Sequence, residues 1–211
     1  MIEELEQILQ KVRELYMRYG IKSITMDDVA SNLGISKKTL YRHVRDKDDL
    51  VGRFVDQEIE IQRQDTSCIQ KNSNLNAIEE LLMVSKMINH KLKQVNPATE
   101  YDLKKYYPHH FARLVESRRE RMYLSIIENI RKGKKEDLYR KELSEDIIGK
   151  LQVSRVESLV NNEVFSIEEF TSPKFFQEIF IYHIRGIANE KGISFLECKL
   201  KDFDIDDITN Y

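Results

Sequence analysis

Apolar residues recur along most of this chain every three or four positions, the spacing that gathers them on one face of an α-helix. Residues 2–19 show the pattern most simply, in a stripe formed by Leu5, Ile8, Leu9, Val12, Leu15, Tyr16 and Tyr19. Gly20 follows the stripe and is typical of a helix end, because glycine readily adopts the left-handed conformation found there. The pattern therefore predicts a helix over residues 2–19 that buries one side.

The same spacing predicts helices through the rest of the chain. They fall at about residues 26–33, 37–44, 47–65, 74–95, 99–107, 109–132 and 144–162, with a last long helix that starts at Ser172-Pro173. A short helical tail is also predicted after Gly192. Glycine (7) and proline (3) are scarce among the 211 residues, so turns and strand bulges should be few. We therefore predict an all-α protein of about nine helices.

Residues 25–47, TMDDVASNLGISKKTLYRHVRDK, predict two short helices joined by a tight turn. Thr25 and Ser36 each precede a helical stretch, where a hydroxyl group caps free backbone N–H groups. Gly34 between them suits the left-handed end of the first helix. Leu40 and Val44 are four positions apart and point to the same, inner side. This is the pattern of a helix-turn-helix, which places its second helix in the DNA major groove.

The second of these helices is strongly basic. Residues 36–47 hold five basic residues and one acidic residue, a net charge of +4, whereas the whole chain carries −2 and the remainder therefore −6. A basic patch confined to one module is expected where a protein contacts DNA phosphates. The alternative is an ordinary solvated basic helix, but the caps, the turn glycine and the charge all agree with a DNA-binding element.

The same stretch resembles the DNA-binding domain of the tetracycline-repressor (TetR) family of bacterial transcription regulators. The matching positions are Thr25, Val29, Ala30, Gly34, Ile35, Ser36, Thr39, Leu40, Tyr41, His43 and Lys47. The chain departs from the pattern at Lys38, where many members have glycine. The resemblance implies a three-helix DNA-binding head at residues 1–47 and a helical ligand-binding and dimerisation body at residues 48–211, with the helix at 47–65 connecting them.

The predicted DNA contacts fall into two groups. The resemblance implies that Thr25, Tyr41, His43 and Lys47 hold phosphates, and Ser36 belongs to the same predicted interface. The start of the second helix presents its outer face to the groove, which makes four side chains the candidates for base edges: Lys37, Lys38, Thr39 and Arg42. Phosphate contacts give salt-dependent affinity, whereas contacts with base edges give sequence choice.

The last long helix is apolar around most of its circumference, so one protomer's core would cover only one side of it. The other side most simply meets a second copy of the chain, and the resemblance likewise implies a four-helix dimer interface from the last two long helices. The predicted interface residues are Ile148, Leu151, Leu159, Phe176, Ile179, Phe180, His183, Ile184 and Ile187. The alternative is a monomer in which this helix is the central core element.

A small-molecule effector is implied by the resemblance, but its site is less clear from the residues. Tyrosine combines an apolar ring with a polar group, as ligand pockets require. The candidates are Met83, Met87, Tyr101, Tyr106, His109, His110, Met122 and Tyr123, and plain core packing is the alternative for each. His109 and His110 are adjacent, so their side chains should point in different directions on a helix. No metal site and no cofactor are therefore predicted.

Enzyme motifs are absent from the sequence: there is no Gly-x-Ser-x-Gly, no glycine-rich phosphate loop and no His-Glu-x-x-His. Cys68 and Cys198 lack metal-site spacing and suggest a reducing cytoplasm. No apolar run is long enough for a membrane span. Together with the resemblance, the sequence predicts a cytoplasmic, dimeric, ligand-responsive regulator, most simply a repressor that binds a palindromic operator. Two alternatives are an effector-independent architectural DNA-binding protein and a module whose basic head binds an acidic protein.

Overall fold

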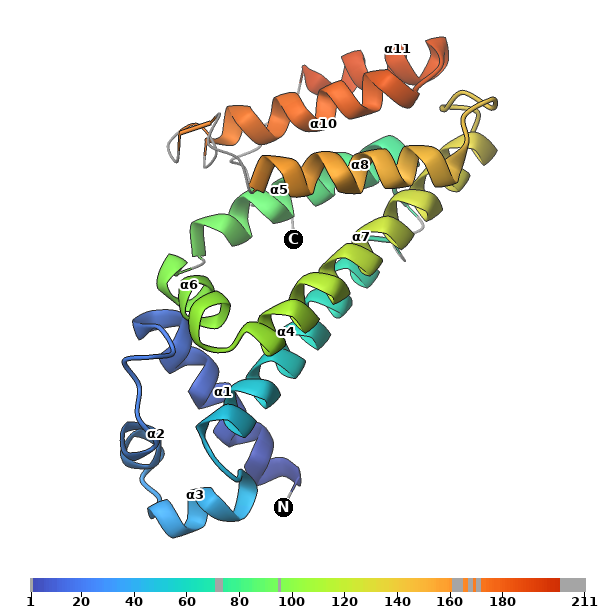
Figure 1. Ribbon diagram of the computed structural model, residues 1–211. Coiled ribbons are helices and arrows are strands. Elements are labelled where there is room, and N and C mark those ends of the chain that lie inside the picture. The colour runs from blue at the N-terminus through green and yellow to red at the C-terminus, as the bar shows by residue number, and fades with distance from the viewer. Residues whose placement is uncertain are drawn as a thin grey trace. The chain divides into compact units, whose positions relative to one another are not determined.

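The computed structural model describes residues 2–70, 74–94, 96–160, 165–166, 169 and 172–201. These residues form ten helices and no strand, apart from an isolated antiparallel bridge between Tyr139 and Ala188 (Figure 1). The all-α prediction is therefore confirmed. The helices are α1 (Ile2–Tyr19), α2 (Met26–Leu33), α3 (Lys37–His43), α4 (Lys47–Gln70), α5 (Ala77–Gln94), α6 (Pro97–Tyr106), α7 (Pro108–Lys135), α8 (Glu145–Val160), α10 (Pro173–Ile187) and α11 (Glu190–Leu200).

The chain divides into two compact units, and α4 and α7 each contribute residues to both. The first unit comprises residues 1–63 and 95–118, and the second comprises residues 64–94 and 119–211. The first part of α4, α6 and the start of α7 thus pack with α1, α2 and α3. The boundary of the first unit therefore differs from the predicted division at residue 47. The reason is that apolar side chains of α4, α6 and α7 complete the core around α1, α2 and α3.

The core of the first unit forms around Tyr16, which is fully buried. The rings of Tyr16 and Phe54 meet edge to face, with centroids 5.3 Å apart. Leu103 of α6 and Leu114 of α7 are buried in the same cluster. Burial of large apolar side chains of this kind stabilises a fold by roughly 1.5–3 kcal/mol each, so α6 and α7 are integral to the unit that holds the helix-turn-helix.

Helix α6 begins earlier than predicted. The Asn96 side chain accepts a hydrogen bond from the Ala98 N–H at 2.9 Å, and Pro97 occupies the first turn. Proline lacks an N–H and has a helical φ angle, so it suits a first helical position. Asn96 therefore caps α6, and Pro97 is its first residue. The Thr99 hydroxyl donates to the Tyr16 carbonyl oxygen at 2.7 Å and joins α6 to α1.

The second unit has its own apolar core, which includes Ile78, Ile130, Ile184 and Leu196. Its centre also holds a polar network around the buried side chain of Asn129. The Asn129 amide group donates to the Ala77 carbonyl oxygen at 2.8 Å and to Glu80 at 3.0 Å, and the Tyr139 hydroxyl donates to its oxygen at 3.1 Å. Each polar group thus has a partner, as burial requires.

Two helix boundaries in the second unit differ from the predictions. Helix α7 passes through Gly133 and ends at Lys135. A Cβ atom at residue 133 would lie 2.1 Å from the Tyr139 ring, so this glycine makes room for an aromatic side chain instead of ending the helix. The predicted short tail is an eleven-residue helix, α11, whose first turn is capped by the Asn189 side chain. None of the described helices has the length and hydropathy that a membrane span needs.

Candidate nucleic-acid interface

The first helix of the predicted helix-turn-helix is closed by a capping box. The Thr25 hydroxyl accepts a hydrogen bond from the Asp28 N–H at 3.1 Å, and the Thr25 N–H donates to the Asp28 carboxylate at 2.8 Å. At the other end Gly34 has φ 65°, and the Ile35 N–H donates to the Ala30 carbonyl oxygen at 3.0 Å. These reciprocal bonds satisfy backbone groups that a helix end leaves free. The predicted caps of α2 are confirmed.

Helix α3 is anchored by apolar residues and presents a basic face. The Ser36 hydroxyl accepts from the Thr39 N–H at 3.0 Å and starts the helix. Leu40 and Val44 are buried in the core of the first unit. The side chains on the opposite side are exposed, and they belong to Lys37, Lys38, Tyr41 and Arg42. An isolated seven-residue helix would not be stable in water, so this face is held by its core contacts.

Other predicted DNA contacts are less exposed. Thr39 is half-buried, and its hydroxyl lies 2.9 Å from that of Ser36. His43 is also half-buried, with Nε2 3.4 Å from a carboxylate oxygen of Glu4. Both side chains are thus less accessible than the four exposed side chains of α3.

Two of the predicted lysine contacts already have partners within the protein. Lys37 pairs with Asp27, and both side chains are mostly exposed. Such a pair contributes little to stability and can be exchanged for a phosphate contact. Lys47 is half-buried, with Nζ 3.3 Å from the Lys22 carbonyl oxygen. Burial lowers the pKa of Lys47, and the carboxylates of Asp102 and Asp28 act in the opposite direction.

The eight predicted ligand residues divide between the two units. Tyr101, Tyr106, His109 and His110 belong to the first unit, and Met83, Met87, Met122 and Tyr123 to the second. Tyr101 and Tyr106 are exposed, and their hydroxyl groups accept from Lys105 at 2.8 Å and Lys22 at 2.7 Å. The Tyr123 hydroxyl donates to the Asp146 carboxylate at 2.6 Å. Met122 packs against the apolar core of the second unit, and Met83 and Met87 are half-buried. Their assignment to a ligand site stays a prediction.

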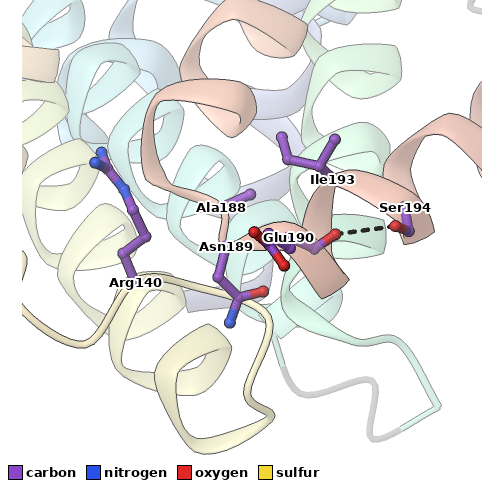
Figure 2. Close-up of a pocket in the computed structure, with 6 residues that line it drawn as sticks. All are labelled: Arg140, Ala188, Asn189, Glu190, Ile193 and Ser194. Atoms are coloured by element: carbon purple, nitrogen blue, oxygen red, sulfur yellow. Dashed lines mark hydrogen bonds between the residues drawn. The ribbon is translucent and has the colours of Figure 1, made fainter.

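A pocket of about 590 Å³ lies in the second unit, at the start of α11 (Figure 2). It is open to solvent, and none of the eight predicted ligand residues lines it. Its lining residues are Arg140, Ala188, Asn189, Glu190, Ile193 and Ser194. The polar side chains around it are engaged locally: Asn189 caps α11, and the Ser194 hydroxyl donates to the Glu190 carbonyl oxygen at 3.0 Å.

The predicted dimer residues separate into core and surface positions. His183, Ile184 and Ile187 of α10 are buried within the protomer, because α10 packs against α5. They are therefore core residues, unlike the prediction. Ile148, Leu159, Ile179 and Phe180 are half-buried, and the Phe176 side chain lies outside the described residues. Leu151 is 61 % exposed, and Ile147 and Tyr182, which lie on the same two helices, are 56 % and 73 % exposed.

Two carboxylates near the interface were not predicted as site residues. Asp102 of α6 accepts the Lys22 N–H at 2.7 Å, next to the start of α2. Asp48, in the first turn of α4, lies 3.5 Å from two histidine side chains of α7. Neither contact could be predicted from neighbouring residues, because the two partners are about 60 to 80 positions apart in the sequence.

Together, the capped helix pair, its buried anchor residues and its basic outer face define a helix-turn-helix protein of the DNA-binding class. Residues 8–54 match the family described as bacterial regulatory proteins, tetR family. Residues 8–54 therefore form a DNA-binding domain of this family's type.

The chain is also similar to a curated transcriptional regulator. The uncharacterised HTH-type transcriptional regulator YvaF of Bacillus subtilis (strain 168) is 33% identical over 102 residues, which cover 48% of this chain and 53% of that protein. The chain thus spans about half the length of this curated relative.

Solved structures show the same fold. A transcriptional regulator from Cytophaga hutchinsonii superposes with a TM-score of 0.73 at 19% identity, over 88% of this chain and 99% of that chain. A TetR-family regulator from Agrobacterium tumefaciens superposes with a TM-score of 0.64 at 16% identity, over 89% and 98% of the two chains. The likeness covers the body as well as the head and concerns the fold alone.

Proposed function

We propose that this protein is a cytoplasmic transcriptional repressor that binds a palindromic operator as a homodimer and responds to a small-molecule effector. The observation that carries the proposal is the exposed basic face of α3. Its cationic side chains lie opposite Leu40 and Val44, which hold the helix on the core. A helix presented in this way fits the major groove of DNA.

The proposed contacts fall into two groups. Thr25, Tyr41, His43 and Lys47 are proposed to hold phosphates, and Ser36 is proposed to belong to the same interface. The remaining candidates occupy the start and outer side of α3 and are proposed to reach base edges: Lys37, Lys38, Thr39 and Arg42. Lysine and arginine pair most often with guanine O6 and N7, so a guanine-containing half-site is expected.

Dimerisation is supported by the apolar surface on α8 and α10. Ile147, Leu151 and Tyr182 leave more than half of their side-chain surface exposed in the protomer. Large apolar side chains on a solvent-facing helix are typical of a protein interface. Two heads that bind successive major grooves would read half-sites about one helical turn, roughly 34–36 Å, apart. An operator with two-fold symmetry follows from such a dimer.

The effector proposal rests on the resemblance to the TetR family, because repressors of this family typically bind a small molecule in the body. The coupling would require that the ligand bind one arrangement of the heads more tightly than another. The residues that would bind it are proposed to come from the eight candidates named above. No metal or cofactor is needed for this mechanism.

The test is selection of bound duplexes from random DNA with the purified full chain at roughly physiological salt. An enriched inverted repeat is expected with the unaltered protein. Arg42→Ala should abolish enrichment, whereas Lys104→Ala, which removes an exposed lysine of α6 outside the helix-turn-helix, should leave the motif unchanged. Binding without enrichment that fades smoothly as salt rises would contradict a sequence-specific repressor and favour an architectural DNA-binding protein.

A further inference from the structure

Three side chains able to bind a metal ion meet where the first turn of α4 lies beside the first turn of α7. The Nε2 atoms of His109 and His110 each lie 3.5 Å from Oδ1 of Asp48. One ligand atom from each residue lies within 4.8 Å of those of the other two. The two imidazole rings have centroids only 3.9 Å apart. Although the two histidines are adjacent on a helix, both therefore face the same carboxylate.

The distance from each histidine Nε2 to the Asp48 carboxylate suits a bridging ion better than a direct hydrogen bond. A hydrogen bond between nitrogen and oxygen is about 2.7–3.2 Å long, which is shorter than the separation of 3.5 Å between each Nε2 and Oδ1. A tetrahedral Zn²⁺ ion with bonds of about 2.0–2.2 Å places neighbouring ligand atoms roughly 3.3–3.6 Å apart. An ion would thus fit between Asp48 and each histidine with little movement of these atoms.

The His110 ring is held in place by packing. Its side chain is only 9% exposed, and it covers Gly52 so closely that a Cβ atom there would lie 2.7 Å from the ring. Its Nδ1 atom is buried and has no hydrogen-bond partner among the described residues. Nε2 faces Asp48 and donates a hydrogen bond to its backbone carbonyl oxygen at 3.1 Å. Coordination through Nε2 would replace this hydrogen bond and move the single imidazole proton to Nδ1.

The chemistry of the three groups selects the class of ion. Two neutral imidazoles and one carboxylate suit Zn²⁺ and similar transition metals, whereas Mg²⁺ and Ca²⁺ prefer oxygen ligands alone. The first turns of α4 and α7 contribute positive potential, which the Asp48 carboxylate offsets. The side chains of His109 and Asp48 are 61% and 53% exposed, so an ion would be reached from solvent and would keep a position for water.

We propose that Asp48, His109 and His110 form a binding site for one divalent transition-metal ion, with Zn²⁺ as the best fit. The ion would join the first turns of α4 and α7, both of which belong to the first unit. The same two helices are already connected further along, where Arg113 pairs with Asp56. Asp48 directly follows Lys47, so occupancy would restrain the segment that carries a proposed phosphate contact.

The experiment is calorimetric titration of Zn²⁺ into the full chain, prepared without a histidine tag and stripped with a chelator. One ion per chain should bind and raise the melting temperature. His109→Gln and Asp48→Asn should each weaken Zn²⁺ binding about tenfold or more, because each removes one of three ligands. Both side chains are mostly exposed, so these variants should fold, and circular dichroism without metal checks this. His90→Gln removes a histidine outside the cluster and should bind Zn²⁺ normally.

Two results would overturn the proposal. One is Zn²⁺ affinity that stays the same in His109→Gln and Asp48→Asn as in the unaltered chain. The other is the absence of any saturable Zn²⁺ binding by the unaltered chain. Co²⁺ added in place of Zn²⁺ supplies an independent readout, since its visible spectrum should show histidine coordination that both variants lose. The measurements involve no DNA, so their outcome does not depend on the proposed repressor function.

Discussion

The Asp102 carboxylate accepts a hydrogen bond from the Lys22 backbone N–H at 2.7 Å. This bond ties α6 to the loop between α1 and α2, three residues before the Thr25 cap. Asp102 is only 8% exposed. The Lys22 carbonyl oxygen in turn lies 3.3 Å from Nζ of Lys47. One peptide segment thus connects α6, the start of α2 and a proposed phosphate contact.

Asp102→Ala should therefore weaken both the fold and DNA binding. It leaves the Lys22 N–H without its acceptor, which should lower the free energy of unfolding by about 1–3 kcal/mol. Urea denaturation measures this change, and fluorescence anisotropy with operator DNA measures affinity. Asp102→Asn keeps an acceptor oxygen and should lose clearly less stability. Equal losses in the two variants would show that the hydrogen bond is not what Asp102 contributes.

The two proposed classes of DNA contact should respond differently to loss of a lysine. Lys47→Ala should weaken binding about equally on operator and scrambled DNA and reduce the salt dependence, because a phosphate contact carries no sequence information. Lys37→Ala should relax discrimination by about 1–3 kcal/mol at one base position. Binding to single-base operator variants measures both effects, and Lys104→Ala is the control. The division of roles fails if the two variants behave alike.

Substitution of Gly34 should destabilise the protein because of its backbone conformation and not because of a steric clash. Its φ is 65°, and a Cβ atom there would meet nothing within 4 Å. Gly34→Ala should therefore destabilise the protein by about 1–2 kcal/mol through strain in the left-handed conformation. Gly186→Ala is the matched control, since its Cβ also meets nothing within 4 Å but its φ is ordinary and it lies in α10. That change should stabilise the protein by roughly 0.5–1 kcal/mol, and thermal unfolding compares the two.

His183 should make stability fall in mildly acidic solution. Burial, and secondarily the charge of Arg155, lowers the pKa of His183 from 6.5 to about 4. Between these values the unfolded chain takes up a proton that the folded chain does not, so the free energy of unfolding falls as the pH is lowered from 6.5 to about 4. The loss should approach roughly 3 kcal/mol.

His183→Gln should remove this part of the pH dependence, and urea denaturation at a series of pH values measures it. His109→Gln is the comparison, because the His109 side chain is 61% exposed. A slope that is unchanged in His183→Gln would mean that other groups cause the acid sensitivity.

Leu151→Glu should break the proposed dimer without unfolding the protomer. Leu151 is 61% exposed in α8, so the substitution costs little in the isolated chain, but a carboxylate buried in an apolar interface would be unpaired. Analytical ultracentrifugation should show a shift to monomer. Leu124→Glu places the same charge at a leucine of α7 that is 50% exposed and should leave the dimer intact. A dimer that survives Leu151→Glu would place the interface elsewhere.

Local interactions explain why the helix-turn-helix was predictable. The capping partners Thr25 and Asp28 are three positions apart, and so are Ser36 and Thr39. The left-handed residue between the two helices is a glycine, which needs no tertiary contact to adopt that conformation. Leu40 and Val44 share a face because of helical geometry. Each of these features depends on near neighbours, so each is visible in the order of residues.

Other features depend on contacts between distant segments. The sequence of α10 does not show whether an apolar side chain contacts α5 or a second protomer. The packing of α10 against α5 places Ile184 and Ile187 in the core of the protomer. Gly133 has the signature of a helix end, but the ring of Tyr139 occupies the space that a Cβ would need.

The sequence by itself therefore determined the helical class, the DNA-binding element and its basic face, because periodicity, caps and charge act over a few residues. Tertiary structure alone decided which apolar side chains are exposed, how Asp102 meets Lys22, and that Asp48 lies beside His109 and His110. These pairs are far apart along the chain, and their approach depends on how whole helices pack.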